Sequence, residues 1–227
     1  LDQPRLDEGN RCVSEFLDYL REFVPRRRGA MTGADDDILI RLLRWESDGY
    51  RLTESELYHQ CIFLLNAGHE TTTNLVGNGV ELLMRFPDVL GQLKQQPGLI
   101  DSAIEEVLRY ESSNQLGNRT TTEDIEIDGV QIPADTVLTL CIGAANRDPA
   151  VFDNPDVFNI ERNPNPHLAF GSGIHTCAGL NVARLEGRIA IGKLIARFPS
   201  LELTSAGQRA HRARFRGFES LPMSTGE

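Results

Sequence analysis

A long stretch without proline, residues 54–86, constrains the fold of this chain more than any other feature. Thr53 and Glu56 form a capping-box pattern at its start, and Pro87 follows its end. These signals predict one long helix. Residues 61–65 within it are apolar on every side, and we therefore expect the helix to cross the hydrophobic core.

Three glycines, Gly68, Gly77 and Gly79, lie inside this predicted helix. Each lowers the stability of a helix by about 1 kcal/mol relative to alanine. A glycine in such a position commonly allows close packing, or the approach of another group to the backbone. We therefore expect this helix to face a tightly packed neighbour or a bound group.

The remaining pattern predicts a mainly helical protein with a small antiparallel β-sheet. Apolar residues recur at helical spacing around the polar segment 25–29, whose arginine run is predicted to be a solvated loop after a helix. Alternating residues on both sides of Asp128-Gly129 predict a hairpin. The other predicted elements are helices at residues 100–110 and 178–198, a buried strand at residues 137–141, and a long irregular loop at residues 146–166.

Composition excludes several classes of protein. The 227 residues carry 23 basic and 33 acidic side chains, and the resulting net charge of −10 disfavours nucleic acid as a partner. No apolar run approaches the roughly 18 residues of a membrane-spanning helix, and the N-terminal segment lacks the apolar stretch of a secretory signal. Four cysteines without paired spacing indicate a reduced, cytoplasmic chain.

A glycine-rich loop, residues 170–179, places Cys177 at the start of a predicted helix. The helix dipole and the free backbone N–H groups favour the thiolate form of a cysteine at such a position. Glycines at positions 171, 173 and 179 leave room for a flat, bulky partner. Taken alone, the loop is equally well explained by a buried structural cysteine beside a helix cap.

The loop matches the pattern F-x-x-G-x-H/R-x-C-x-G, and in it the chain resembles the cytochrome P450 family of heme-thiolate monooxygenases. The resemblance implies that Cys177 is the proximal ligand of the iron of heme b (iron protoporphyrin IX). It also implies that His175 binds a heme propionate and that Phe170 and Gly179 contact the cofactor. A thiolate axial ligand donates electron density to the iron and favours O–O cleavage.

A second motif, Ala67-Gly68-His69-Glu70-Thr71, lies inside the long predicted helix. Its glycine lets a planar ligand approach the helix, its threonine can loosen the backbone hydrogen bonds, and an acid beside a hydroxyl offers a proton route. The motif resembles the family's A-G-x-D/E-T signature on the distal side of the heme. The resemblance implies heme contacts for Ala67 and Gly68 and proton delivery by Glu70 and Thr71. His69 is expected to be a surface or packing residue.

Glu106 and Arg109 lie three residues apart on one face of the predicted helix 100–110. They match the family's E-x-x-R motif, which implies a buried structural ion pair that supports the loop before the cysteine. Many members add a further cation in a P-E/D-R-F segment, but this chain has Val157 at that position. Arg162 lies nearby, and the sequence does not show whether it substitutes.

Arg119 lies just before the first predicted strand, and the resemblance implies that its forked guanidinium group pairs with a heme propionate. Without the other motifs, an exposed loop arginine would explain it. The resemblance extends from about residue 53 to the end of the chain. We therefore divide the sequence into N-terminal helices at residues 1–52 and a single, incomplete heme-binding domain at residues 53–227.

The N-terminal half that family members carry is missing from this sequence, which begins with Leu1. The chain is therefore either an incomplete fragment or a naturally short relative. One side of the heme would be partly uncovered in either case. The exposed apolar surface would favour self-association, or binding of the missing half.

The preferred hypothesis for function is a monooxygenase, or the C-terminal portion of one, that inserts one oxygen atom from O2 into a small organic substrate. The electrons would come from a redox partner of the ferredoxin type, which we expect because the chain is acidic and shows no membrane anchor. The alternative is a non-catalytic heme-binding or structural remnant. A zinc site formed by His167, His175 and Cys177 is a more remote hypothesis, because their spacing suits no common zinc motif.

Overall fold

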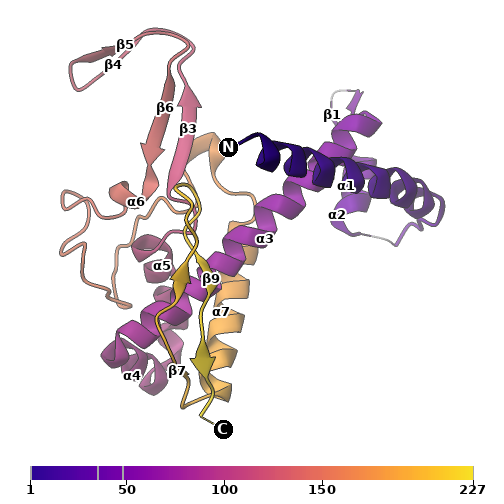
Figure 1. Cartoon of the computed structure of the whole chain (residues 1–227). Coiled ribbons are helices and arrows are strands. Elements are labelled where there is room, and N and C mark those ends of the chain that lie inside the picture. Colours follow the sequence, from indigo (N-terminus) through magenta and orange to yellow (C-terminus); the bar gives the residue numbers. More distant parts are fainter. Residues whose placement is uncertain (1, 35, 48, 227) are drawn as a thin grey trace. The chain divides into compact units, whose positions relative to one another are not determined.

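The computed structural model describes residues 2–34, 36–47 and 49–226. The chain divides into two compact units, Leu1–His69 and Glu70–Glu227. Helix α3 (Glu54–Arg85) begins in the first unit and ends in the second (Figure 1). The division predicted at residue 53 coincides with the start of this helix and stays a prediction. Within the described ranges, no helix has both the length and the apolar character needed to cross a membrane.

The first unit is built from two helices, a short pair of strands and the beginning of α3. The elements before α3 are α1 (Gln3–Gly29), α2 (Ile38–Arg44), β1 (Glu46–Ser47) and β2 (Tyr50–Arg51). Its small core consists of Leu20, Val24, Leu57 and Tyr58. These side chains belong to α1 and α3, so the apolar faces of the two helices hold the unit together.

The capping box predicted at the start of α3 is confirmed. The Thr53 N–H donates to the Glu56 carboxylate at 2.8 Å, and the Glu56 N–H donates to the Thr53 hydroxyl at 3.3 Å. Two backbone donors that the helix itself leaves without partners are thereby satisfied. The helix ends at Arg85, directly before Phe86 and Pro87.

The arginine run at residues 26–28 is not a loop, and that prediction is wrong. Helix α1 continues through Pro25 to Gly29. Arg27 pairs with Asp37 at 2.7 Å, and Arg28 pairs with Glu54 at 2.6 Å. Cations in the last turn also complement the helix dipole. These interactions favour helical geometry in a segment whose composition alone indicates a break.

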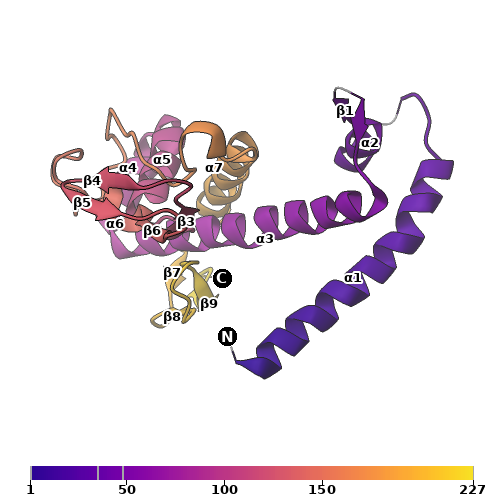
Figure 2. The same ribbon diagram turned by 90° about the horizontal axis from the view of Figure 1, so that it is seen from above.

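Helices form the core of the second unit. Helices α4 (Pro87–Gln95), α5 (Ile100–Tyr110) and α7 (Leu180–Arg197) lie beside the C-terminal part of α3 (Figure 1, Figure 2). The short helices are η1 (Pro97–Leu99), α6 (Ile142–Ala145) and η2 (Gly173–His175). The buried apolar core includes Leu75, Leu82, Leu83, Ile104 and Ile191. The predicted helices at residues 100–110 and 178–198 are confirmed, and the second begins at Leu180.

The apolar segment 61–65 of α3 is only partly covered, contrary to the prediction that it crosses the core: Cys61 and Ile62 pack against the small core of the first unit, but the next three residues are exposed. Phe63 and Leu65 are 64% and 58% exposed. The buried part of the helix lies further on, where Leu75, Leu82 and Leu83 are at most 2% exposed. An apolar stretch in the sequence indicates a surface that is stabilised by burial. It does not indicate whether another segment of the described chain packs against that surface.

The glycines of α3 have different surroundings. A Cβ atom added at Gly79 would lie 2.5 Å from Ile191 Cδ1, so α3 and α7 pack closely at this point, as the prediction for these glycines allows. At Gly77 the nearest atom, on Phe218, would be 3.9 Å away. Gly68 has no atom within 4 Å of such a Cβ. Of the three, therefore, only Gly68 leaves the helix backbone open to an incoming group.

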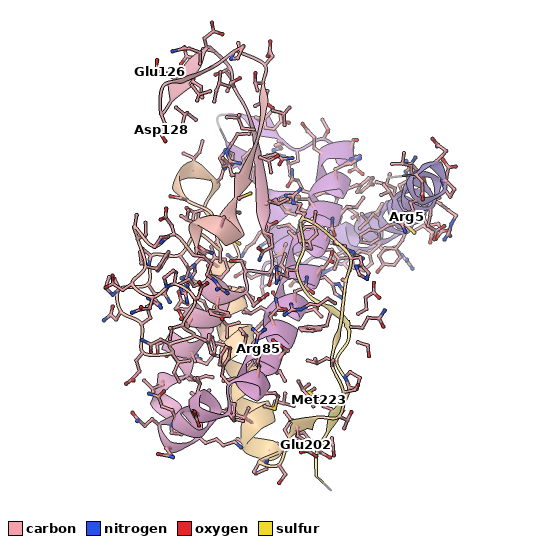
Figure 3. The ribbon with its side chains drawn as sticks, turned by 60° about the vertical axis from the view of Figure 1, so that its left-hand side comes forward. Arg5, Arg85, Glu126, Asp128, Glu202 and Met223 are labelled. Carbon is pink, nitrogen blue, oxygen red and sulfur yellow. The ribbon has the colours of Figure 1, made fainter. Side chains whose placement is uncertain are left out.

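The strands of the second unit form two-stranded antiparallel sheets, which agrees with the predicted small amount of antiparallel structure. The pairs are β3 (Leu116–Thr120) with β6 (Val137–Cys141), β4 (Ile125–Ile127) with β5 (Val130–Ile132), β7 (Glu202–Leu203) with β10 (Met223–Ser224), and β8 (Gln208–Arg209) with β9 (Phe218–Ser220). Figure 3 shows Glu126 and Asp128 at one end of this unit and Glu202 and Met223 at the other.

The predicted hairpin is confirmed, but one strand is less buried than predicted. Asp128 and Gly129 have φ angles of 48° and 77°, the left-handed conformation that a tight two-residue hairpin turn requires. Strand β6 was expected to be buried, and that expectation is wrong, since Val137 and Leu140 are 65% and 44% exposed. Strand β3 is its partner in the two-stranded sheet, and within the described residues these two side chains stay largely exposed.

Candidate functional site

The loop before α7 presents the thiol of Cys177 at the surface. The Cys177 N–H donates to the Phe170 carbonyl oxygen at 2.8 Å, which closes the loop on itself. Gly171 and Gly173 have φ angles of 71° and 65°, a conformation that only glycine adopts without strain. Helix α7 begins at Leu180, so the thiol lies close to the positive end of a helix dipole.

The glycines around Cys177 suit the approach of a flat, bulky group. A Cβ atom added at Gly179 would lie 3.9 Å from the sulfur, and one added at Gly171 would lie 3.1 Å from the His175 carbonyl oxygen. Gly173 has no atom within 4 Å of an added Cβ. Any side chain at these positions would narrow the space beside the sulfur or distort the loop that carries it.

The donor atoms at this loop suit heme better than zinc. In the described part of the chain, no three histidine, cysteine, aspartate or glutamate side chains come together as a metal-holding group. His167, a member of the hypothetical zinc site, instead contacts Glu105 at 3.1 Å. A structural zinc ion needs four ligands, whereas a heme iron needs one axial thiolate from the protein on its proximal side. Within the described residues, the loop therefore presents one exposed thiol and no set of zinc ligands around it.

Glu106 and Arg109 form the buried ion pair that the sequence predicts. Arg109 Nε lies 2.8 Å from Glu106 Oε2, and both side chains are 0% exposed. Arg109 Nη2 donates to Glu106 Oε1 at 2.8 Å and to the Val157 carbonyl oxygen at 3.1 Å, and Nη1 donates to the carbonyl oxygens of Asn146 at 2.9 Å and Pro155 at 2.8 Å. Every N–H of the guanidinium group thus has an acceptor, which a buried cation needs. The pair fixes the irregular segment that leads to the cysteine loop.

Arg162 supplies the further cation that Val157 cannot. Its Nε lies 3.2 Å from Glu106 Oε2, and its side chain is 9% exposed. The amide nitrogen of Asn165 also donates to this oxygen, at 3.1 Å, while the backbone N–H of Asn159 donates to Glu106 Oε1 at 2.9 Å. The Glu106 carboxylate is therefore the centre of a closed network in which the departure at Val157 is compensated five residues later in the chain.

A second acidic residue, Glu105, joins α5 to the cysteine loop and to α7. Its Oε1 accepts from Arg184 Nε at 2.7 Å, and its Oε2 accepts from Arg184 Nη2 at 2.7 Å. His167 Nε2 lies 3.1 Å from Oε2, and its side chain is 3% exposed. The Arg184 guanidinium group also lies over the Phe170 ring, 4.9 Å from its centre. Two parallel hydrogen bonds to one carboxylate make this a strong and directional pair.

Glu105 makes the stability of the fold depend on pH. Burial acts to raise its pKa, but hydrogen bonds from His167 and Arg184 and the Arg184 charge outweigh burial and lower the pKa from 4.5 to about 2. Because the folded-state pKa is depressed, the stabilisation is present above about pH 4.5 and is lost as the pH falls towards 2.

We expect urea unfolding to show that the free energy of unfolding of the native chain falls more steeply between pH 4.5 and pH 2 than that of Glu105→Gln. The glutamine variant cannot take up this proton, so it lacks that part of the acid destabilisation. Parallel curves for the two proteins over this range would contradict the assignment.

The distal motif lies on α3 across the boundary of the two units. Ala67 and Gly68 belong to the first unit and are exposed, whereas Glu70 and Thr71 belong to the second and are half-buried. The Glu70 carboxylate forms an ion pair with Arg212, from the segment between β8 and β9. Glu70 is therefore tied by this ion pair to the segment between β8 and β9.

The two predicted propionate partners are both exposed in the second unit. Arg119 lies on β3, opposite Leu138 of β6, and its Nη1 donates to the Asn118 carbonyl oxygen at 2.8 Å. His175 ends the short helix η2, two residues before the cysteine. Both side chains can offer N–H donors to a carboxylate, and the forked group of Arg119 can offer two at once.

Sequence reasoning missed three residues that the structure places at or beside the site: Glu105, Arg184 and Arg212. For Glu105, the only local signal in the sequence is its position next to Glu106 on the same predicted helix. The partners of Glu105 and of Glu70 lie 79 and 142 residues away in the sequence. Helical or strand periodicity does not reveal contacts over such separations.

A protein-family model described as "Cytochrome P450" matches residues 1–215 of the chain. The chain is 44% identical over 220 residues to the "Biotin biosynthesis cytochrome P450" of Bacillus subtilis (strain 168), covering 96% of this chain and 55% of that protein. It is 40% identical to the "Vitamin D(3) 25-hydroxylase" of Pseudonocardia autotrophica, covering all of this chain and 57% of that protein. The chain thus spans little more than half the length of these relatives.

Solved structures show the same similarity. P450BioI in complex with an acyl carrier protein carrying hexadec-9Z-enoic acid matches with a TM-score of 0.92 and 43% identity, covering 99% of this chain and 57% of that one. The cytochrome P450 PksS of the Bacillus subtilis 168 bacillaene polyketide synthase matches with a TM-score of 0.93 and 40% identity, covering 100% of this chain and 58% of that one.

Proposed function

Because the chain belongs to the cytochrome P450 family, we propose that it is the heme-binding portion of a heme-thiolate monooxygenase. The complete protein would insert one oxygen atom from O2 into a small organic substrate, with electrons from a redox partner. The observation that carries this proposal is the exposed thiol of Cys177, held in a glycine-rich loop that the Glu106 ion cluster supports. A fixed, accessible thiolate is what a proximal heme ligand must provide.

Several residues would hold the heme. Cys177 would provide the axial sulfur, Phe170 and Gly179 would flank it, and Arg119 and His175 would donate to the propionates. Ala67 and Gly68 would form the distal surface, where Gly68 leaves the backbone open. When bound, a thiolate-ligated heme supplies the activation of O2 and the transfer of oxygen to the substrate.

Glu70 and Thr71 are proposed to deliver protons on the distal side. The Glu70 carboxylate is half-buried on α3 and paired with Arg212. Breaking and reforming this pair would let the carboxylate turn between solvent and the neighbouring Thr71 hydroxyl, and so carry a proton inward. General acid groups positioned in this way typically contribute a factor of about 10² to 10⁴ in rate.

An absorption spectrum tests the proposal. Purified protein that is reduced and treated with carbon monoxide should show a band at about 450 nm, which reports a thiolate-bound heme. Heme-loaded protein should also oxidise a chromogenic organic substrate when hydrogen peroxide replaces O2 and the electron donor. A protein without the band would contradict the proposal. A protein with the band but without turnover would indicate the alternative, a heme-binding remnant.

Gly68→Ala tests the distal surface. The added methyl group finds open space in the heme-free chain and raises helix propensity, so we expect the free energy of unfolding to rise by up to about 1 kcal/mol. We expect heme affinity to fall, because the methyl group would occupy the face of α3 proposed to meet the heme. Urea unfolding and heme titration measure the two effects.

Gly77→Ala is the matched control for Gly68→Ala, because its added Cβ also meets no atom closer than 3.9 Å. It should give a similar gain in stability with unchanged heme affinity. Equal heme affinity in both variants would show that Gly68 does not face the cofactor.

Glu70→Gln tests the proton route. It should slow O2-driven turnover about 10²-fold while leaving heme binding unchanged. Arg212→Gln is the matched control, because it breaks the same ion pair but keeps the carboxylate. Equal rates for the two variants would show that the ion pair, and not the acid, is what turnover requires.

A ferredoxin-type redox partner and a cytoplasmic location complete the proposal. The four cysteines are all free thiols, which supports a reducing compartment. The net charge of −10 gives no support to a nucleic-acid partner. Reduction of the heme-loaded protein by a small panel of ferredoxins, compared with flavodoxins, would identify the class of partner.

A further inference from the structure

We propose that Glu105, acting with His167 and Arg184, is a positioning residue for the cysteine loop, separate from the Glu106 ion cluster. The three side chains clamp residues 167–177 between α5 and α7 and thereby fix the direction of the Cys177 thiol. This inference rests on the proposed function for the role of Cys177, but the clamp itself consists of contacts within this chain.

His167 attaches the beginning of the loop to Glu105. Its Nδ1 accepts from the backbone N–H of Ala169 at 3.3 Å, so the ring donates through Nε2 to the Glu105 carboxylate at 3.1 Å. With the side chain 3% exposed, water hardly competes for these bonds. The His167 ring therefore links the backbone at Ala169 to Glu105 on α5.

Arg184 attaches the loop to Glu105 at Phe170. It is fixed by two hydrogen bonds of 2.7 Å to Glu105, and its guanidinium group lies 4.9 Å from the centre of the Phe170 ring. The Phe170 carbonyl oxygen accepts the Cys177 N–H at 2.8 Å. The path from the carboxylate to the cysteine backbone thus runs through one bidentate ion pair, one cation–π contact and one hydrogen bond.

Glu105 and Glu106 hold different parts of the segment that leads to Cys177. Glu106 binds Asn159, Arg162 and Asn165, all of which precede His167 in the chain. Glu105 binds His167 and, through Arg184, reaches Phe170. Losing the Glu105 contacts would free the last part of the loop while leaving the Glu106 network intact. The clamp should therefore affect the geometry of the thiol more than the stability of the whole unit.

The full chain without heme provides the first test, in which hydrogen exchange is followed by mass spectrometry of peptides. In Glu105→Gln and Arg184→Lys, peptides covering residues 168–177 should exchange at least about ten-fold faster than in the native chain. Peptides from α3 and from the β3–β6 pair should keep their rates. Arg184→Lys retains the charge and removes only the fork, so it keeps the test decisive if the glutamine variant folds poorly.

Asp101→Asn is the matched control. Asp101 pairs with Arg188 at 3.4 Å across the same two helices, α5 and α7, but both side chains are exposed. This variant should leave exchange in residues 168–177 unchanged. Faster exchange spread evenly over the second unit, or equal rates in all variants, would overturn the positioning role.

The heme-loaded protein gives an independent readout. The clamp variants should lose part of the carbon monoxide band at about 450 nm to forms without thiolate ligation, and Asp101→Asn should not. Full retention of that band in both clamp variants would overturn the positioning role. If the native protein never shows the band but the exchange effect is confined to residues 168–177, the proposed function fails and the clamp stands.

Discussion

Cys177→Ser is expected to abolish the absorption band at about 450 nm of the reduced, carbon monoxide-treated protein and to lower its heme content severely. A serine hydroxyl stays protonated and is a weak iron ligand, whereas the cysteine thiolate carries charge and donates electron density. The change is nearly isosteric. The hydrogen bond from the Cys177 N–H to the Phe170 carbonyl oxygen involves only backbone atoms, so the substitution should not break it. A loss of heme in Cys177→Ser would therefore be caused by the missing sulfur and not by a change in the loop.

Heme-to-protein ratio and absorption spectra measure this effect, and Cys141→Ser is the control. Cys141 is also an exposed free thiol of the second unit, at the end of β6. The control should keep both the ratio and the band. If Cys177→Ser retains the pigment and its spectrum, Cys177 is not the ligand, and the proposed function loses the observation that carries it.

Local signals were sufficient for the parts of the fold that local interactions determine. The Thr53–Glu56 capping box and the Asp128-Gly129 turn were predicted because each depends on residues close together in sequence. Burial was predicted less well. Residues 63–65 and most of strand β6 are exposed, because burial depends on which other segments cover an apolar surface. A pattern within one segment cannot supply that information.

The same distinction explains the candidate site. Glu106 and Arg109 could be paired from sequence because they lie one helical turn apart. The pairs Arg162–Glu106 and Arg184–Glu105 could not, since they join residues 56 and 79 positions apart. The arginine run 26–28 shows the opposite error, in which a composition typical of loops is held in a helix by distant acids. Long-range ion pairs are thus a second source of disagreement, beside burial.

Arg109→Lys is expected to destabilise the second unit by about 3 kcal/mol or more. The lysine keeps the positive charge but has three donors in place of five, and its reach is different. Carbonyl oxygens that Arg109 now satisfies, those of Asn146, Pro155 and Val157, would lose their partners in a buried environment. Urea unfolding measures the change, and heme retention should fall with it because this network supports the cysteine loop.

Arg188→Lys is the control for the charge-conserving change. Its ion pair with Asp101 is exposed on both sides, so its loss should alter the free energy of unfolding by less than about 1 kcal/mol. Comparing the two variants shows how much of the stability lost in Arg109→Lys comes from the buried, forked guanidinium group and how much from any replacement of arginine by lysine. If both variants unfold at the same urea concentration as the native chain, the Glu106–Arg109–Arg162 network does not hold the segment that leads to Cys177, and another interaction must fix that loop.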